Sequence, residues 1–172
     1  MAKNIEFKAK INNYSLVYQS VAELTKVNPT VLLQKDIFYK THFGRLKLRS
    51  ICNTKHELIF YLRPNKKGPK CSKYIRVHIN NQSLVDSLLT KMLGQLVVVK
   101  KQRDLFLLDN IRFHLDRVDE LGAFLEIEYV LSPMESREAA LSTVNNLIHR
   151  LQIQKNMLVN HSYAELLLSK FG

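Results

Sequence analysis

The chain has 172 residues, and its content of 46% hydrophobic and 24% charged residues is that of an ordinary folded domain. With 5 Gly and 4 Pro, the composition argues against a long disordered segment, and no apolar run reaches the ~18 residues of a membrane-spanning helix. The formal net charge of +11 calls for an anionic partner or counterions, and nucleic acid, an anionic membrane surface or a polyphosphate would each supply one.

The N-terminal segment does not resemble an export signal, because Met1 to Lys10 alternates charged and apolar residues and has no apolar core. Cys52 and Cys71 form no Cys-X-X-Cys pair, which favours two reduced thiols over a disulfide or a metal role. We therefore expect a cytoplasmic protein with no membrane partner and a single domain over residues 1–172.

The pattern in the first half of the chain predicts strands and one helix. Residues 4–11 alternate polar and apolar side chains, which predicts a strand. Residues 13–27 then carry one apolar stripe and indicate a helix, for which Asn13 is a suitable N-cap. Alternation with period two predicts three further strands, over residues 34–40, 45–49 and 58–64.

The middle of the chain begins with a basic loop over residues 64–72, which is the best candidate for a mobile segment. A strand over residues 73–79 and a helix over residues 83–93 follow, and Gly94 is a suitable end for that helix. Three more strands complete a set of eight, over residues 97–103, 111–116 and 125–129.

Short turns and capping boxes organise the C-terminal part. The turns at residues 109–110 and 119–122 predict hairpins, so the last three strands should pair antiparallel. A capping box at residues 132–135, with Pro133 at the first helical position, predicts the start of a helix. A second box at residues 162–165 predicts another short helix.

The side of the sheet that the charges face decides the function. In an open sheet or sandwich the charged face would lie in water and the apolar face in the core. The amphipathic helices need apolar partners, however, and the apolar strand faces would provide them. We therefore predict an α+β fold, a closed eight-stranded antiparallel β-barrel or tunnel with helices packed outside and a charged lumen.

Basic side chains recur on the polar face of strand after strand. Crowding them into a closed barrel would be unfavourable without an anion, and a polyphosphate offers several charges along an extended axis. Arg112 shares this face and is assigned to the same triphosphate-binding set. The other members are Lys8, Arg45, Lys47, Arg49, Arg63, Lys101 and Arg103.

Carboxylates on the same faces suggest a metal site. Glu126 and Glu128 lie two apart on one strand, and barrel closure would bring Glu6 on the first strand close to them. Three oxygen ligands suit Mg²⁺ or Mn²⁺, although the same residues could simply neutralise nearby cations. Asp116 could orient or deprotonate a nucleophile, bind a second metal, or form a structural ion pair.

Several segments of the chain resemble the CYTH family of triphosphate tunnel enzymes, in particular its class IV adenylyl cyclase-like branch. The matching segments are NIEFKAKI, QKDIFYKTHFGRLKLRS, LIFYLRPN, VVVKKQR, IRFHLDRVDELGAFLEIEYVL and HSYAELLL. The resemblance implies a triphosphate in the barrel and catalysis with Mg²⁺ or Mn²⁺. Lys8 falls on the lysine of the family's ExExK motif and Asp116 on its late aspartate, and we assign both residues catalytic roles.

One position departs from the family pattern. Asn4 stands where ExExK has its first glutamate, and a neutral carbonyl oxygen is a weaker Mg²⁺ ligand than a carboxylate. Either one ion is bound by Glu6, Glu126 and Glu128, or the tunnel binds its ligand with little catalysis.

The branch resemblance favours a cyclase that converts ATP to cyclic AMP and pyrophosphate. The alternatives are a triphosphatase acting on thiamine triphosphate, tripolyphosphate or a nucleotide, and a non-catalytic module that binds polyphosphate or a nucleotide. Nucleic acid is disfavoured as a partner because the patterned cations should point inward. The sequence leaves open whether the protein forms a homodimer.

Overall fold

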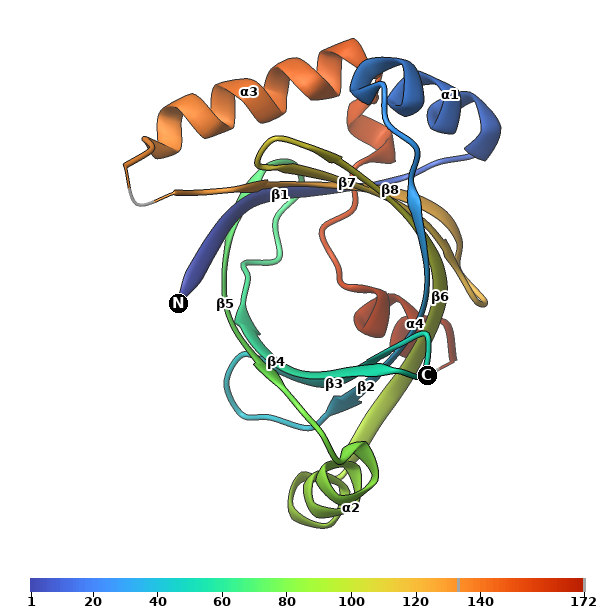
Figure 1. Ribbon diagram of the computed structural model, residues 1–172, viewed down its shortest axis with the longest axis vertical. Helices are drawn as coiled ribbons and strands as arrows, with labels where there is room; N and C mark the ends of the chain where they lie inside the picture. Colours follow the sequence, from blue (N-terminus) through green and yellow to red (C-terminus); the bar gives the residue numbers. More distant parts are fainter. Residues whose placement is uncertain (133, 172) are drawn as a thin grey trace.

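The computed structural model describes residues 1–132 and 134–171, and within them eight antiparallel strands close into a barrel (Figure 1). This confirms the predicted fold class. The strands are β1 (Ala2–Lys10), β2 (Thr30–Tyr39), β3 (Arg45–Ile51), β4 (Lys55–Leu62), β5 (Lys70–His78), β6 (Gln95–Leu108), β7 (Ile111–Val118) and β8 (Gly122–Val130).

The strand order around the barrel is β1-β5-β4-β3-β2-β6-β7-β8, so the first strand closes the barrel against the last. In that pairing Lys8 lies opposite Glu126 and Glu6 lies opposite Glu128. Residues paired across antiparallel strands point to the same side of the sheet. Closure therefore brings Glu6 and the two late glutamates to neighbouring positions on the inner face, as expected.

The helices are α1 (Tyr14–Thr25), α2 (Gln82–Leu93), α3 (Arg137–Arg150) and α4 (Tyr163–Phe171). Helices α1 and α3 lie together over β1, β7 and β8, whereas α2 lies on the far side of the barrel near β2 and β3 (Figure 1). Outward-facing residues such as Phe7, Phe113 and Ile127 form the main core with α1 and α3. The apolar strand faces thus cover the apolar helix stripes, which leaves the polar faces for the lumen.

Helix α4 differs from the other three because it packs against inner-face residues. Tyr163, Ala164 and Leu167 form an apolar cluster with inward-facing residues that include Phe38 and Phe124. In the end-on view of Figure 1, α4 lies inside the outline of the barrel. This apolar cluster closes one end of the lumen, and the charged cavity lies beyond it.

Most predicted helix ends are confirmed. Asn13 caps α1 by accepting a hydrogen bond from the backbone N–H of Leu16, and α2 ends at Gly94. The box at residues 162–165 also forms, since the Ser162 N–H donates to Glu165 and the Glu165 N–H donates back to the Ser162 hydroxyl. The capping box thereby gives hydrogen-bond partners to two backbone N–H groups at the start of α4.

The predicted start of the third helix is wrong. The Ser132 N–H does donate to the carboxylate of Glu135, but α3 begins at Arg137 with Ser136 as its N-cap. A serine that can cap stands four residues after Ser132, and it forms the bond to the backbone N–H of Ala139 instead. Pro133 lies outside the described residues.

The predicted loop over residues 64–72 is too long, because its last three residues belong to β5. The side chain of Lys70 consequently lies inside the structure, with a residue exposure of 1%. The hairpin turns at residues 109–110 and 119–122 connect β6 to β7 and β7 to β8, as predicted. Among the described residues, no helix is long and apolar enough to cross a bilayer.

Candidate functional site

The inner faces of the strands enclose a cavity of about 130 Å³. Among the described residues that line it, eight are Lys or Arg and four are Asp or Glu, so cations are in excess. The cations are Lys8, Lys47, Arg49, Arg63, Arg76, Lys101, Arg103 and Arg112, and the carboxylates are Glu6, Asp36, Glu126 and Glu128.

The most completely paired cation is Arg103, near the end closed by α4. Its Nε and Nη2 donate to the two oxygens of Asp116 over 2.6 Å each. The Tyr163 hydroxyl also donates to Asp116 over 2.9 Å, and Lys101 Nζ lies 3.5 Å away. Burial alone would raise the pKa of Asp116, but Arg103 and Lys101 outweigh it and hold that pKa below its usual range.

A second carboxylate, Asp36 on β2, holds two cations of β3. Arg49 donates to it from Nε and Nη2 over 2.7 and 2.8 Å, and Lys47 Nζ donates over 2.9 Å. Burial opposes the ionised form of Asp36, yet the Arg49 and Lys47 charges keep its pKa well below normal. The cations are therefore fixed in place before any ligand arrives, which lowers the ordering cost of binding.

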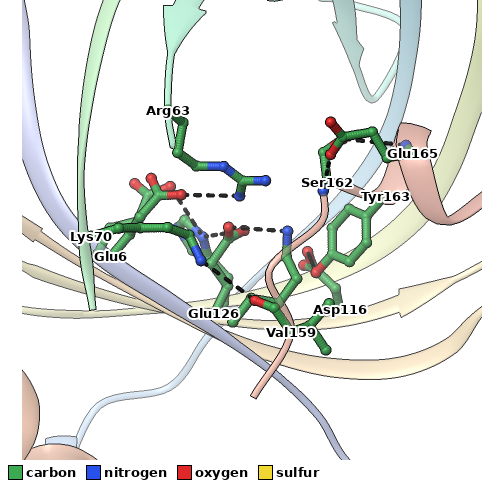
Figure 2. Close-up of polar contacts among 12 residues, drawn as sticks. Glu6, Arg63, Lys70, Asp116, Glu126, Val159, Ser162, Tyr163 and Glu165 are labelled. Carbon is green, nitrogen blue, oxygen red and sulfur yellow. Dashed lines mark hydrogen bonds and ion pairs between the residues drawn. The ribbon is translucent and has the colours of Figure 1, made fainter. Parts of the chain in front are cut away.

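Arg63 is held on one side only. Its Nη1 donates to Glu6 Oε1 over 3.2 Å, as Figure 2 shows, while Nε and Nη2 have no hydrogen-bond partner among the described residues. The side chain is only 3% exposed. Burial, followed by the charges of Glu126 and Glu128, raises the pKa of Glu6 to about 7 despite Arg63. At Glu6 burial and the two neighbouring carboxylates thus outweigh the effect of Arg63.

The two late glutamates lie side by side on β8 with a histidine of β7 against them. Lys8 Nζ lies 3.3 Å from Glu126 Oε1, and Arg103 Nη2 lies 3.3 Å from Glu126 Oε2. His114 Nδ1 lies 3.8 Å from an oxygen of each glutamate. These three residues form a group whose potential ligand atoms all lie within 4.8 Å of one another, the kind of arrangement that can hold a divalent ion.

Two residues assigned to triphosphate binding lie away from the centre of the lumen. Arg45 borders a separate cavity and pairs with Glu165 of α4 over 2.7 Å, while Arg112 pairs with Glu128 over 3.5 Å and is more exposed than the central cations. Arg112 still lines the central cavity, as do Glu6, Glu126, Glu128 and the other assigned cations, which are Lys8, Lys47, Arg49, Arg63, Lys101 and Arg103. Asp116 lies behind that lining and is completely buried.

Several inward residues received no role from the sequence. Asp36 and His114 were visible on the polar faces of their strands, but period-two alternation does not say which cation or carboxylate each would meet. Tyr163 was assigned only to a helix. Lys70 was placed in a loop, yet its Nζ donates to the backbone oxygens of Lys66 and Val159. It thereby links the β4–β5 connection to the segment that precedes α4, beside Glu6 (Figure 2).

A larger cavity of about 820 Å³ adjoins the lumen and shares Phe38, Arg63 and Ser162 with its lining. Its walls are mostly apolar and come from the β2–β3 connection, the end of β4 and α4, with Arg45 and Glu165 at its polar part. A charged chamber next to an apolar one can accept a molecule with an anionic end and an organic end.

The profile of the CYTH domain matches residues 2–163, which is nearly the whole chain. The chain belongs to the CYTH family. A CYTH-type triphosphate tunnel accounts for the closed barrel and for the excess of cations inside it. A putative adenylate cyclase of Methanocaldococcus jannaschii is 27% identical over 107 residues, which are 58% of this chain and 61% of that protein. The matched part thus spans about three fifths of the relative's length.

Solved CYTH-like structures share the fold over almost the full chain. A protein of Pyrococcus horikoshii has a TM-score of 0.83 at 22% identity, with 95% of this chain and 98% of that chain covered. A putative adenylate cyclase of Vibrio parahaemolyticus has a TM-score of 0.76 at 21% identity, covering 96% and 97%. A putative adenylyl cyclase of Hippeastrum, described as having a dominant triphosphatase activity, has a TM-score of 0.68 at 15% identity, covering 99% and 96%.

Proposed function

We propose that this protein is a metal-dependent enzyme that binds a triphosphate in its lumen and converts ATP to cyclic AMP and pyrophosphate. The observation that carries the proposal is Arg63, a buried guanidinium with two nitrogen donors that lack partners among the described residues. A buried donor without a partner costs about 1–3 kcal/mol, and more when it is charged, so an anion in the lumen would relieve that cost. The excess of lysine and arginine around Arg63 favours a ligand with several negative charges.

The phosphate chain would lie among six cations of the lumen. The two arginines that are already clamped, Arg49 and Arg103, would offer the donors that Asp36 and Asp116 leave free. We propose that Asp116 positions Arg103 and does not act as the base, because both of its oxygens accept hydrogen bonds and its pKa is depressed. The six cations are Lys8, Lys47, Arg49, Arg63, Lys101 and Arg103.

In the cyclase reaction the ribose 3′-oxygen attacks the α-phosphorus, the bond from that phosphorus to the bridging oxygen breaks, and pyrophosphate leaves. The 3′-hydroxyl proton passes to a base or to solvent. In this proposal Lys8, which is buried beside Glu126, would stabilise the negative charge that develops on the departing pyrophosphate.

The residues present suit a divalent metal ion. Glu126 and Glu128 are hard oxygen donors that lie close enough together to share an ion, and Glu6 faces them from β1 outside that compact group. Mg²⁺ or Mn²⁺ bound there would supply positive charge to the phosphate oxygens during the reaction.

A triphosphatase is the second candidate, and the size of the lumen favours it. A cavity of about 130 Å³ suits a phosphate chain better than a whole nucleotide, so a base would have to occupy the adjacent cavity of about 820 Å³. In this reaction water attacks the γ-phosphorus, the bond from that phosphorus to the β,γ-bridging oxygen breaks, and the diphosphate leaves. The proton of the water passes to a base or to solvent, and the same cations would hold the phosphate chain.

A product panel tests both reactions. Purified protein is incubated with ATP, tripolyphosphate or thiamine triphosphate and with Mg²⁺ or Mn²⁺. A cyclase yields cyclic AMP and pyrophosphate in equal amounts, whereas a triphosphatase releases inorganic phosphate. Arg63→Met should abolish either product, and Arg150→Met on the exposed side of α3 should not. Binding of tripolyphosphate without any product would leave only the non-catalytic module.

A further inference from the structure

His114 is a buried titratable side chain to which neither the proposed phosphate site nor the proposed reaction gives a role. It lies on β7 directly across from Glu126 of β8, and its side chain is 5% exposed. Nδ1 has no hydrogen-bond partner among the described residues. Buried imidazole nitrogens usually have one, since a buried polar atom left alone costs about 1–3 kcal/mol.

The position of this nitrogen is unusual for a structural histidine. Nδ1 is 3.8 Å from Glu126 Oε2 and 3.8 Å from Glu128 Oε1, which is too far for a hydrogen bond to either oxygen. Two ligands of one octahedral ion lie roughly 3 Å apart when adjacent and roughly 4 Å apart when opposite. Only one oxygen can lie opposite Nδ1 on such an ion, so at least one glutamate side chain must shift towards the imidazole when an ion binds. Both separations of 3.8 Å are too long for a hydrogen-bonded histidine.

The two glutamates differ in their other contacts, because Glu126 Oε2 also accepts a hydrogen bond from Arg103 over 3.3 Å, whereas Glu128 Oε1 faces the imidazole alone. Arg112 approaches Glu128 from its second oxygen, Oε2, so Oε1 faces the imidazole. An imidazole can bind a metal in its neutral form, in which one ring nitrogen keeps the lone pair that a metal needs.

Glu6 is less well placed for the same ion. Its carboxylate is held by Arg63 over 3.2 Å, and in the described part of the chain it does not join the compact group of potential ligands. His114 occupies the third position of that group, on the strand next to the two glutamates.

We propose that His114 donates Nδ1 to the divalent ion bound by Glu126 and Glu128, so that the centre has one nitrogen and two carboxylate ligands from the protein. This inference rests on the proposed metal dependence and refines it. An imidazole ligand favours transition metals over Mg²⁺, which prefers oxygen ligands. The centre should therefore select Mn²⁺ from a mixture of Mn²⁺ and Mg²⁺.

The experiment uses Mn²⁺ as the probe and needs no turnover. The purified protein is stripped of metal with a chelator and titrated with Mn²⁺, and the bound ion is examined by pulsed electron paramagnetic resonance. In the wild type we expect ¹⁴N couplings from an imidazole. His114→Phe should lose those couplings and weaken Mn²⁺ binding by about tenfold or more, the cost seen even for residues one shell further from a metal.

Matched variants separate the outcomes. His114→Asn serves if the Phe variant does not fold, since it keeps a polar side chain without an imidazole, and His149→Asn on the exposed surface of α3 should retain the couplings. Bound Mn²⁺ without ¹⁴N couplings in the wild type overturns this inference and leaves the metal proposal standing. If the wild type binds no Mn²⁺ at all, the metal part of the proposed function fails, and this inference fails with it.

Discussion

Asp116 holds Arg103 through two parallel hydrogen bonds of 2.6 Å at the end of the lumen that α4 closes. The carboxylate is completely buried, and it also accepts a hydrogen bond from Tyr163 of α4. Two strands of the barrel, β6 and β7, and helix α4 therefore meet at one carboxylate. The charge of Asp116 compensates a cation that is proposed to bind phosphate, and its hydrogen bonds fix that cation's orientation.

Asp116→Asn should lower the free energy of unfolding by about 3–5 kcal/mol, because it removes the nearest counter-charge of the buried Arg103 and Lys101. Urea unfolding measures the change. Asp119→Asn, in the exposed turn after β7, is the control and should stay within about 0.5 kcal/mol of wild type. Tripolyphosphate should recover part of the loss, since an anion in the lumen replaces the missing charge. A loss below about 1 kcal/mol would contradict this account of the ion pair.

Triphosphate binding should be accompanied by proton uptake at pH 8. Burial and then the charge of Arg103 lower the pKa of Lys101 to about 7, while burial and then Arg49 lower the pKa of Lys47 to about 8. Lys101 is then mostly neutral at pH 8 in the free protein, and an anion beside it favours the charged form. The affinity for tripolyphosphate should therefore fall as the pH rises above 7.

Calorimetry in buffers of different ionisation enthalpy measures that uptake. Lys101→Met should reduce the number of protons taken up, whereas Lys100→Met, on the outer face of the same strand, should leave it unchanged. Proton uptake that is equal in all three proteins would show that these protons go elsewhere.

Asn4→Glu should add a second metal site. Asn4 is only 3% exposed, and its Oδ1 has no hydrogen-bond partner among the described residues. It lies two residues before Glu6 on β1, so a glutamate there would extend the carboxylate cluster. We expect the Mn²⁺ stoichiometry to rise from one to two and the metal-free protein to lose stability through carboxylate repulsion.

Asn4→Gln has the same chain length without the charge and is the matched control. It should bind one ion, as the wild type does. A stoichiometry of one for Asn4→Glu, with no change in turnover, would mean that Asn4 does not limit the centre.

Glu165→Ala should cost about 1–2 kcal/mol of stability, because Glu165 completes the capping box of α4 and also pairs with Arg45. Burial opposes the ionised form of Glu165, but hydrogen bonds from Ser162, Arg45 and Asn65 lower its pKa to about 2. This stabilisation is fully present above the ordinary glutamate value of 4.5 and is lost as the pH falls towards 2.

Hydrogen exchange in residues 163–171 reports the loosening of α4 directly. It should accelerate in Glu165→Ala and remain unchanged in Glu138→Ala, which alters an exposed glutamate in the first turn of α3. Unchanged exchange in both variants would argue that the apolar cluster holds α4 without its cap.

The sequence alone determined which side chains share a face. In a strand, successive side chains point to opposite faces, so residues two apart share a side. Alternation with period two therefore put Glu126 and Glu128 on the same side of one strand. It put Lys101 and Arg103 on the same side of another. The need of the amphipathic helices for apolar partners then turned those polar faces inward. The eight strands, the closed barrel and the charged lumen could be predicted on this basis.

Only the tertiary structure decided which of the inward residues meet. The register between strands and the closure of β1 on β8 place Arg63 against Glu6 and His114 between the two glutamates, and neither follows from spacing along the chain. Arg45 likewise lies on the predicted face but near its end, where α4 supplies Glu165 as its partner. Period and polarity fix the direction of a side chain, whereas its depth in the barrel and its neighbours depend on pairings between strands that are distant in sequence.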